Sequence, residues 1–417
     1  MTRWTKSFVK MATILTLFVL MGLPGQGFLS SADAAQLKFK DGRVWDGEIL
    51  QETDKLVKFR LELGGIEQIK WVPKADLKEI VRDEDEPDKD AAAGNSDTDA
   101  RHSTKPGDKD FDPDVPTLVF IPMEEMVGTY MNRKPLKEAL EKAVEYGDNA
   151  VAVLVFNSGG GMLREIQPMS DIIEEYKHKI RVVAWIKSAI SAAAMTSLTV
   201  EEIYFMPEGH FGACTGFYQE GGSYKLVKGD DLQQVLFMME RISERGGYDP
   251  LIMRKMQVNW FTLSADIDED GVVTFHPDDS GEYIVSPKGE ILVFNSEDAV
   301  KYGFAKGVAE TEDQLADLLQ LHEWQRSDVG EKIMYEWHET IRTAEKEVPL
   351  LIKKLQRAMS TIGGNEKTKK RSLGQARQYL QKLRQWNKKA EIICLINGIN
   401  DETLRRLDKQ IRDLARN

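Results

Sequence analysis

The stretch that decides the fold runs from Val151 to Cys214 and reads VAVLVFNSGGGMLREIQPMSDIIEEYKHKIRVVAWIKSAISAAAMTSLTVEEIYFMPEGHFGAC. The apolar run at 151–156 predicts a buried strand, and the glycines at 159–161 predict a turn. The next segment has the period of a helix, and a second apolar run at 182–186 leads to Ser191 in a row of small residues. Two neighbouring strands are therefore expected to end in a glycine turn and a serine.

This pairing has a chemical meaning. Glycines at a turn between a strand and a helix leave backbone N–H groups open to a ligand, because no Cβ blocks the approach. A serine at the head of a small-residue helix keeps its hydroxyl accessible, and the helix dipole there favours negative charge. A parallel β-α-β unit with a polar helix cap explains the same residues equally well.

A family resemblance favours the chemical interpretation. Residues 157–161, NSGGG, resemble the N-S-P-G-G turn of the Clp protease proteolytic subunit and the D-x-P-G-G turn of signal peptide peptidase A and NfeD-type serine proteases. The resemblance covers about half of the chain, residues 116–321, and places Ser191 at the nucleophile position. It implies an α/β fold of the Clp/crotonase type, a spiral of β-β-α units, closest to the signal-peptide-peptidase and NfeD-type group. Gly159 replaces the family's proline, which makes the turn more flexible.

The resemblance also implies the residues of a catalytic site. Ser191 would be the nucleophile, and backbone amides would form an oxyanion hole, with the contributing residues Gly160, Gly161 and Ala192. No metal or other cofactor is expected in this chemistry.

The general base is the open question of this site. The position that holds a histidine in the Clp subunit is Cys214 here, and His210 lies nearby but outside the register. The signal-peptide-peptidase and NfeD-type enzymes use a Ser-Lys dyad instead, and Lys225 and Lys228 lie in the expected interval. Lys228 aligns better than Lys225, although an ordinary solvated loop lysine explains either residue equally well.

The function that follows is an exported serine peptidase that hydrolyses peptide bonds in peptide or protein substrates, membrane proteins included. The resemblance further implies a homo-oligomer. Two alternatives stay open, of which the first is a catalytically inactive scaffold or adaptor that retains the fold. The second is a crotonase-type acyl-CoA enzyme, which is disfavoured because export separates the protein from coenzyme A.

Composition shifts divide the chain into five expected parts. Residues 1–34 have the basic start, short apolar run and small-residue cleavage pattern of a signal peptide, with an uncleaved anchor as the alternative, so an exported, periplasmic or extracellular protein is expected. Residues 35–82 predict a small SH3-like or Sm-like β-barrel, and 83–113 an acidic disordered linker. The protease-like domain follows at 114–321, and 322–417 predict helices that contact an oligomer or partner.

Composition also limits the partners. The chain of 417 residues is 41% hydrophobic and 30% charged with a formal net charge of −12, which argues against a nucleic-acid surface. Zinc-ligand motifs are absent from the sequence. Residues 266–271 match the start of a calcium loop, but the twelfth position is Pro277 in place of glutamate, so an acidic hairpin turn is the preferred interpretation.

Overall fold

The computed structural model describes residues 33–40, 44–52, 56–63, 66–74, 77–82, 103–109, 111–220, 223–362 and 365–416. The chain divides into two compact units, residues 1–98 and residues 99–417. Most of the expected signal peptide, residues 1–32, and residues 83–102 of the expected linker lie outside the described residues. Residues 103–109 of that linker are described and belong to the second unit, where Thr104 N–H donates to the Arg326 carbonyl at 2.9 Å.

The first unit contains five antiparallel strands. They are β1 (Asp33–Phe39), β2 (Val44–Glu52), β3 (Leu56–Leu63), β4 (Ile66–Pro73) and β5 (Leu77–Arg82), in the sheet order β4-β3-β2-β1-β5. Alternate side chains such as Leu37, Val57 and Phe59 are buried on one face, as the two-residue period of a strand requires. In this order β4 and β5 are the outer strands of the sheet, so the predicted closed barrel is not confirmed.

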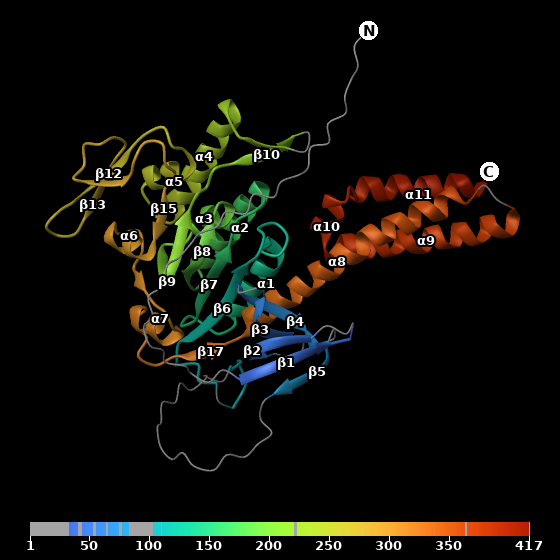
Figure 1. Ribbon diagram of the computed structural model, residues 1–417, viewed down its shortest axis with the longest axis horizontal. Coiled ribbons are helices and arrows are strands. Elements are labelled where there is room, and N and C mark those ends of the chain that lie inside the picture. The colour runs from blue at the N-terminus through green and yellow to red at the C-terminus, as the bar shows by residue number, and fades with distance from the viewer. Residues whose placement is uncertain are drawn as a thin grey trace, which may run out of the picture. The chain divides into compact units, whose positions relative to one another are not determined.

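The second unit is built on a mixed sheet, which confirms the predicted α/β class (Figure 1). Four parallel strands form its centre in the order β9-β8-β7-β6, and these are β6 (Thr117–Glu124), β7 (Val151–Ser158), β8 (Arg181–Ile190) and β9 (Glu202–Gly212). The short strands β15 (Val293–Asn295), β16 (Gly307–Val308) and β17 (Gln325–Ser327) extend the edges. Strands β6 to β8 are apolar along nearly their whole length, because both faces of the parallel centre are covered.

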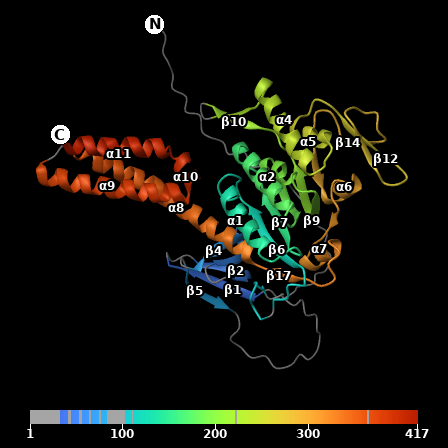
Figure 2. The same cartoon turned by 180° about the vertical axis from the view of Figure 1, so that it is seen from behind.

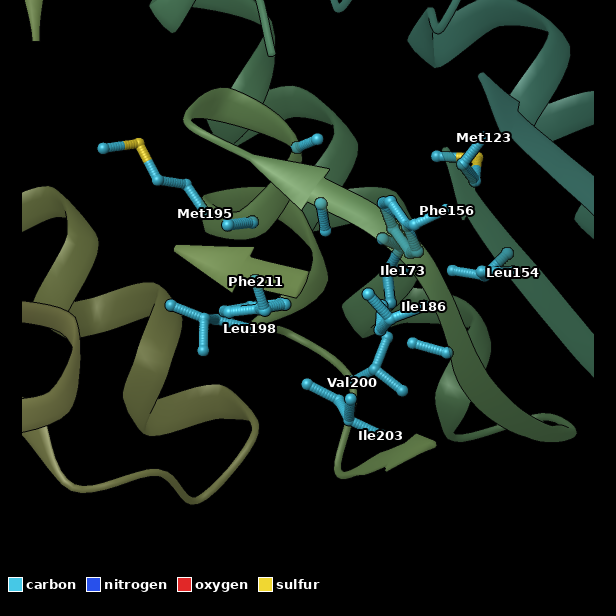
Figure 3. Packing of buried hydrophobic residues seen from close by; sticks show 14 of the residues in the cluster. Met123, Leu154, Phe156, Ile173, Ile186, Met195, Leu198, Val200, Ile203 and Phe211 are labelled. Atoms are coloured by element: carbon cyan, nitrogen blue, oxygen red, sulfur yellow. The ribbon is translucent and has the colours of Figure 1, made fainter. Parts of the chain in front are cut away.

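Helices cover the two faces of this sheet. The connections α1 (Arg133–Val144), α2 (Leu163–Lys177) and α3 (Ala192–Ser197) bury their apolar sides in the large core, and α7 (Glu312–Leu318) covers part of the opposite face. Figure 3 shows the large core, with Phe156 and Ile186 of the strands close to Ile173 of α2. The alternation along β7 and β8 thus directs successive side chains into one or the other of two cores. The parallel pairing of these strands brings their ends to the same sheet edge.

A long segment of hairpins and helices follows β9. It begins with the hairpin β10 (Phe217–Glu220) and β11 (Ser223–Leu226), and it continues through α4 (Gly229–Arg245), α5 (Pro250–Gln257), β12 (Leu263–Ile267), β13 (Val273–His276) and β14 (Tyr283–Ser286) to α6 (Ser296–Lys301). Lys255 is fully buried, and its Nζ donates to the carbonyls of Phe261 at 2.6 Å and Pro287 at 2.9 Å. This ammonium joins α5 to the segments that enter β12 and leave β14, at one end of the three-stranded sheet.

The C-terminal residues are helical. Their elements are α8 (Val329–Ser360), α9 (Glu366–Lys389), α10 (Glu391–Ile396) and α11 (Asp401–Arg416). The first part of α8 lies against β6 and α1, and the rest extends away from the sheet, as both views show (Figure 2). This outer part of α8 packs against α9, which also packs against α11. A separate apolar core holds these helices together, with Ile341, Leu380 and Ile411 among its buried members. Across the described parts of the chain, no helix has the length and apolar character needed to cross a membrane.

A buried histidine on α8 is expected to make stability depend on pH. His338 is buried between the ring edges of Tyr130 and Tyr335, and burial, with a smaller contribution from Arg342, lowers its pKa to about 4. The unfolded imidazole titrates near about 6.5, so between these two values the unfolded chain binds a proton that the folded chain does not. The free energy of unfolding should therefore fall by up to about 3 kcal/mol as the pH decreases from about 6.5 to about 4.

Urea unfolding as a function of pH measures this effect. His338→Leu should flatten the pH dependence in this range, whereas the same change at the exposed His322 should leave it unchanged. An equal slope in wild type and His338→Leu would show that other groups cause the loss of stability.

Candidate functional site

The glycine turn and Ser191 meet at one edge of the sheet. Strands β7 and β8 are parallel neighbours whose register pairs Ser158 with Ala189, so their ends arrive together (Figure 1). A Cβ added to Gly160 would lie 2.6 Å from the Ser191 Cβ and 2.8 Å from the Ile190 carbonyl oxygen. The turn is therefore in direct contact with the serine, and only glycine leaves room for this approach.

Ser191 adopts an unusual backbone conformation. Its φ is 57° and its ψ is −124°, which is rare for a residue with a side chain and costs about 1–3 kcal/mol. Its N–H donates to the Gly212 carbonyl at 2.9 Å, and its own carbonyl accepts from Met195 N–H at 3.0 Å. The half-buried side chain makes no capping hydrogen bond to α3. Strain of this kind concentrates at functional sites, so the geometry marks Ser191 as a candidate nucleophile.

The three candidate oxyanion donors differ in their hydrogen bonding. The Gly160 N–H donates to Ser158 Oγ at 3.1 Å, and that hydroxyl donates to the Glu125 carbonyl. By contrast, the N–H groups of Gly161 and Ala192 donate to no other group in the part of the chain that the structure describes. Gly160 thus supplies close packing, while Gly161 and Ala192 supply the open N–H groups.

Cys214 is the residue that the family resemblance aligns with the histidine of the Clp subunit. It is fully buried, and burial raises the pKa of its thiol well above the usual range. Its Sγ lies 3.6 Å from the Ser191 carbonyl oxygen, to which the thiol donates. A protonated, buried thiol that faces the main chain of Ser191 is unsuited to accept a proton from the Ser191 hydroxyl.

His210 has a different partner. Its Nε2 lies 3.0 Å from Ser188 Oγ, and its Nδ1 lies 3.4 Å from the Glu208 carbonyl oxygen. The register of β8 and β9 places His210 directly beside Ser188, three residues before Ser191. The imidazole therefore contacts Ser188 and leaves the lysines as the remaining candidates for the base.

Both candidate lysines lie on or after the β10–β11 hairpin. Lys225 is in β11, Lys228 is the residue that precedes α4, and both are exposed. Between them, Val227 N–H donates to the Gly216 carbonyl at 2.9 Å, and a Cβ at Gly216 would touch both Val227 and Leu163, the first residue of α2. The chain thus returns close to the glycine turn, but within the described residues Lys228 Nζ makes no hydrogen bond to Ser191 Oγ.

The structure adds residues that the sequence interpretation did not include. Ser158 and Gly212 hold the turn and the serine in place, and Ser158 is part of the quoted NSGGG motif. Lys255 is a buried lysine, and burial lowers its pKa. Its ammonium is already hydrogen-bonded to two carbonyls, so its role is structural. No local pattern marked it, because its burial depends on the distant Pro287.

Comparison with known proteins supports the family resemblance. No protein-family model matches the chain. Membrane protein NfeD1b of Bacillus subtilis (strain 168) is 27% identical over 220 residues, which cover 51% of this chain and 43% of that protein. The chain is similar to NfeD-type proteins. The predicted resemblance is therefore confirmed, whereas the activity of the full-length relative is a separate question, because the match spans less than half of its length.

Several solved structures are also similar. The 1510-N membrane protease specific for a stomatin homolog from Pyrococcus horikoshii is 17% identical, with a TM-score of 0.33, over 48% of this chain and 78% of that chain. A mutant of the 1510-N protease in complex with a substrate peptide is 17% identical, with a TM-score of 0.38, over 49% and 80%. ClpP1 from Listeria monocytogenes is 14% identical, with a TM-score of 0.31, over 47% and 94%. The similarity to NfeD-type proteins is carried by the sequence match and not by these scores.

The sequence match to NfeD1b corrects the expected location of the protein. The sequence predicted a freely exported protein with a cleaved signal peptide. That prediction is wrong, because the NfeD relative is named a membrane protein. An N-terminal leader and a membrane anchor have similar basic and apolar segments, so short apolar length alone did not separate them.

Proposed function

We propose that this NfeD-like chain is a membrane-associated serine peptidase that cleaves peptide bonds with Ser191 as nucleophile. The observation that carries the proposal is the positive φ of Ser191, held in contact with Gly160 at the end of two parallel strands. In this proposal Gly161 and Ala192 donate to the oxyanion, and Lys228 is the general base with Lys225 as the alternative.

The reaction is an acyl transfer to Ser191 followed by hydrolysis. The neutral lysine accepts the hydroxyl proton while Oγ bonds to the peptide carbonyl carbon, and the carbonyl oxygen becomes an oxyanion held by two N–H groups. When the intermediate collapses, the C–N bond breaks and the leaving amine takes the proton from the lysine. A water molecule then attacks the acyl-enzyme and gives a proton to the same lysine. The ester C–O bond breaks as the lysine returns this proton to Ser191 Oγ, which releases the acid and regenerates the hydroxyl and the neutral lysine. Each oxyanion donor contributes on the order of 100-fold to 1,000-fold to the rate.

The exposure of the lysines sets a condition on this mechanism. A lysine accepts a proton near neutral pH only when its ammonium form is destabilised by loss of water. Lys225 and Lys228 are solvated in the isolated chain, so a peptide or a partner must cover the hairpin before either can act. The proposed enzyme therefore becomes competent when substrate binding buries the β10–β11 hairpin.

Paired lysine variants test the identity of the base. Lys228→Ala is expected to lower peptide hydrolysis and labelling of Ser191 by a fluorophosphonate at least about 100-fold, because general base catalysis contributes about 10²- to 10⁴-fold. Lys225→Ala, three residues away on the same exposed segment, is the matched control and should retain most of the activity. The reverse pattern would assign the base to Lys225, and unchanged activity in both variants would exclude the dyad.

One observation favours a second function, that of an inactive scaffold. The position that holds a histidine in the Clp subunit is a buried cysteine here, and both candidate lysines are exposed to solvent. Wild-type protein that hydrolyses no peptide and takes up no fluorophosphonate, while it still binds peptides, would support the scaffold.

The wider assembly belongs to the same proposal. A peptide or protein substrate fits the acyl-transfer site, and the helices α8, α9 and α11 offer a long surface for homo-oligomer or partner contact. Sedimentation of the full chain in detergent, with and without residues 361–416, would show whether these helices mediate self-association.

A further inference from the structure

A pocket of about 280 Å³ lies away from Ser191, in the second compact unit. The first turns of α1 and α2 form one side of it, and the other sides are Trp337 of α8 and the corner where α9 ends and α10 begins. The volume is close to the lower limit of ordinary small-ligand sites. The residues at this corner therefore enclose space for a small ligand.

Positive side chains dominate the pocket. Five of its lining residues are cationic, namely Arg133, Lys134, Arg164, Lys388 and Lys389, and two are carboxylates, Glu165 and Glu391. The Arg133 Nε lies 3.7 Å from Glu165 Oε2, whereas the other four make no ion pair with a carboxylate among the described residues. Lys134 is instead directed to the Lys389 carbonyl at 3.5 Å and to the Trp337 ring at 5.5 Å. Unpaired cations beside two helix N-termini favour an anionic ligand.

Glu165 further restricts the kind of ligand that fits the pocket. This residue lines the pocket and is 4% exposed. Its Oε2 accepts no hydrogen bond in the described part of the chain, because the Arg133 Nε, at 3.7 Å, lies beyond hydrogen-bond distance. Burial raises the pKa of the carboxyl, and Arg133 and Arg164 oppose that shift. A buried acceptor without a donor is costly, so a ligand that fits must also bring a hydrogen-bond donor.

We propose that this pocket binds a phosphate group that still carries a proton. The arginine and lysine side chains bind its charged oxygens, and Glu165 Oε2 accepts the hydrogen bond from the P–OH group. Hydrogen phosphate keeps an O–H at neutral pH, whereas sulfate of the same shape and charge has none and would face the carboxylate with an acceptor. The pocket should therefore select phosphate over sulfate. Free phosphate and the terminal phosphate of a lipid headgroup share this chemistry.

The position of the pocket links it to the catalytic layer. Arg164 and Glu165 belong to the first turn of α2, which starts two residues after Gly161. A bound phosphate would connect the first turn of α2 to Lys388 and Lys389 at the end of α9. The ligand would thus bridge the helical C-terminal region and the helix that follows the glycine turn.

Calorimetric titration of the full chain tests the selectivity. Inorganic phosphate and sulfate are compared at mildly alkaline pH, with ionic strength held constant by chloride. We expect phosphate to bind at least about tenfold more tightly, since one charge-assisted hydrogen bond is enough for that difference. Glu165→Gln should bind both anions and lose the preference, because its amide donates to sulfate as well; a gain of sulfate binding cannot arise from misfolding.

Charge variants locate the binding site. The pair Lys388→Gln and Lys389→Gln should weaken phosphate binding at least about tenfold. The pair Lys369→Gln and Lys370→Gln, at the other end of the same helix α9, is the matched control and should bind as wild type does. Equal losses in the two double variants would overturn the assignment, as would equal affinity of wild type for phosphate and sulfate.

Vesicles distinguish the two sources of phosphate. Co-sedimentation with vesicles that contain phosphatidic acid, but not with pure phosphatidylcholine vesicles, would identify the lipid headgroup as the ligand. This vesicle binding must be lost in the Lys388→Gln and Lys389→Gln double variant, and soluble phosphate must reduce it. Phosphate binding in the calorimeter without vesicle binding would assign the free anion. Absence of both signals would refute the site.

Discussion

Replacing Ser191 by glycine is expected to abolish fluorophosphonate labelling and peptide hydrolysis and, at the same time, to raise the free energy of unfolding by about 1 kcal/mol. Glycine removes the nucleophilic oxygen, and it also adopts a φ of 57° without the penalty that serine carries. The relief of strain exceeds the entropy that glycine adds to the unfolded chain. Labelling and urea unfolding of the same protein preparation measure the two effects.

Ser191→Ala separates the two effects of the glycine substitution. Alanine also lacks the hydroxyl, so labelling should be lost, but its Cβ retains the strained conformation and no gain in stability is expected. If glycine and alanine gave the same stability, the positive φ would carry no strain. Labelling that persists in both variants would show that another residue is the nucleophile, and the neighbouring Ser188 would be the first candidate to test.

Gly160→Ala is expected to destabilise the protein by about 2–4 kcal/mol and to lower labelling at Ser191. The new Cβ would lie 2.6 Å from the Ser191 Cβ and 2.8 Å from the Ile190 carbonyl oxygen, and the φ of +97° at this position is itself unfavourable for alanine. Because one of the opposing atoms belongs to the backbone, the strain cannot be relieved by a side-chain rotation. Urea unfolding gives the free energy, and labelling rates report the displacement of the serine.

The adjacent Gly159 is the matched control for this experiment. A Cβ there would meet no atom within 4 Å, and its φ lies outside the left-handed region. Gly159→Ala should therefore be neutral or slightly stabilising, by up to about 1 kcal/mol. A similar loss of stability in both variants would mean that the whole turn tolerates no side chain, and that contact with Ser191 is not the cause.

The sequence predicted the centre of the fold because that centre depends on local patterns. The apolar runs of β7 and β8 and the helical period of α2 are each visible within a short window, and parallel pairing follows from their alternation. The glycines and Ser191 then lie at strand ends by counting alone. Their contact was expected from topology, but the positive φ of Ser191 was not, since serine is ordinary at the head of a helix.

The remaining features depend on contacts between distant residues. The Gly160 N–H donates to Ser158 Oγ, and His210 Nε2 lies within hydrogen-bond distance of Ser188 Oγ. Both contacts depend on side-chain geometry, which the spacing of residues in the sequence does not give. The position of Lys228 depends on where the β10–β11 hairpin folds back to Leu163, which a linear alignment does not give. The predicted barrel at residues 35–82 required closure between β4 and β5, and local strand patterns carry no information about closure.

Cys214 provides a probe of motion behind the nucleophile. The thiol is enclosed, its pKa is raised, and it touches the main chain of Ser191, so a thiol reagent reaches it only when this segment opens. Cys394 is buried in the separate core of the C-terminal helices. The two modification rates would thus time the opening of each core independently, from the two cysteines that the chain already contains.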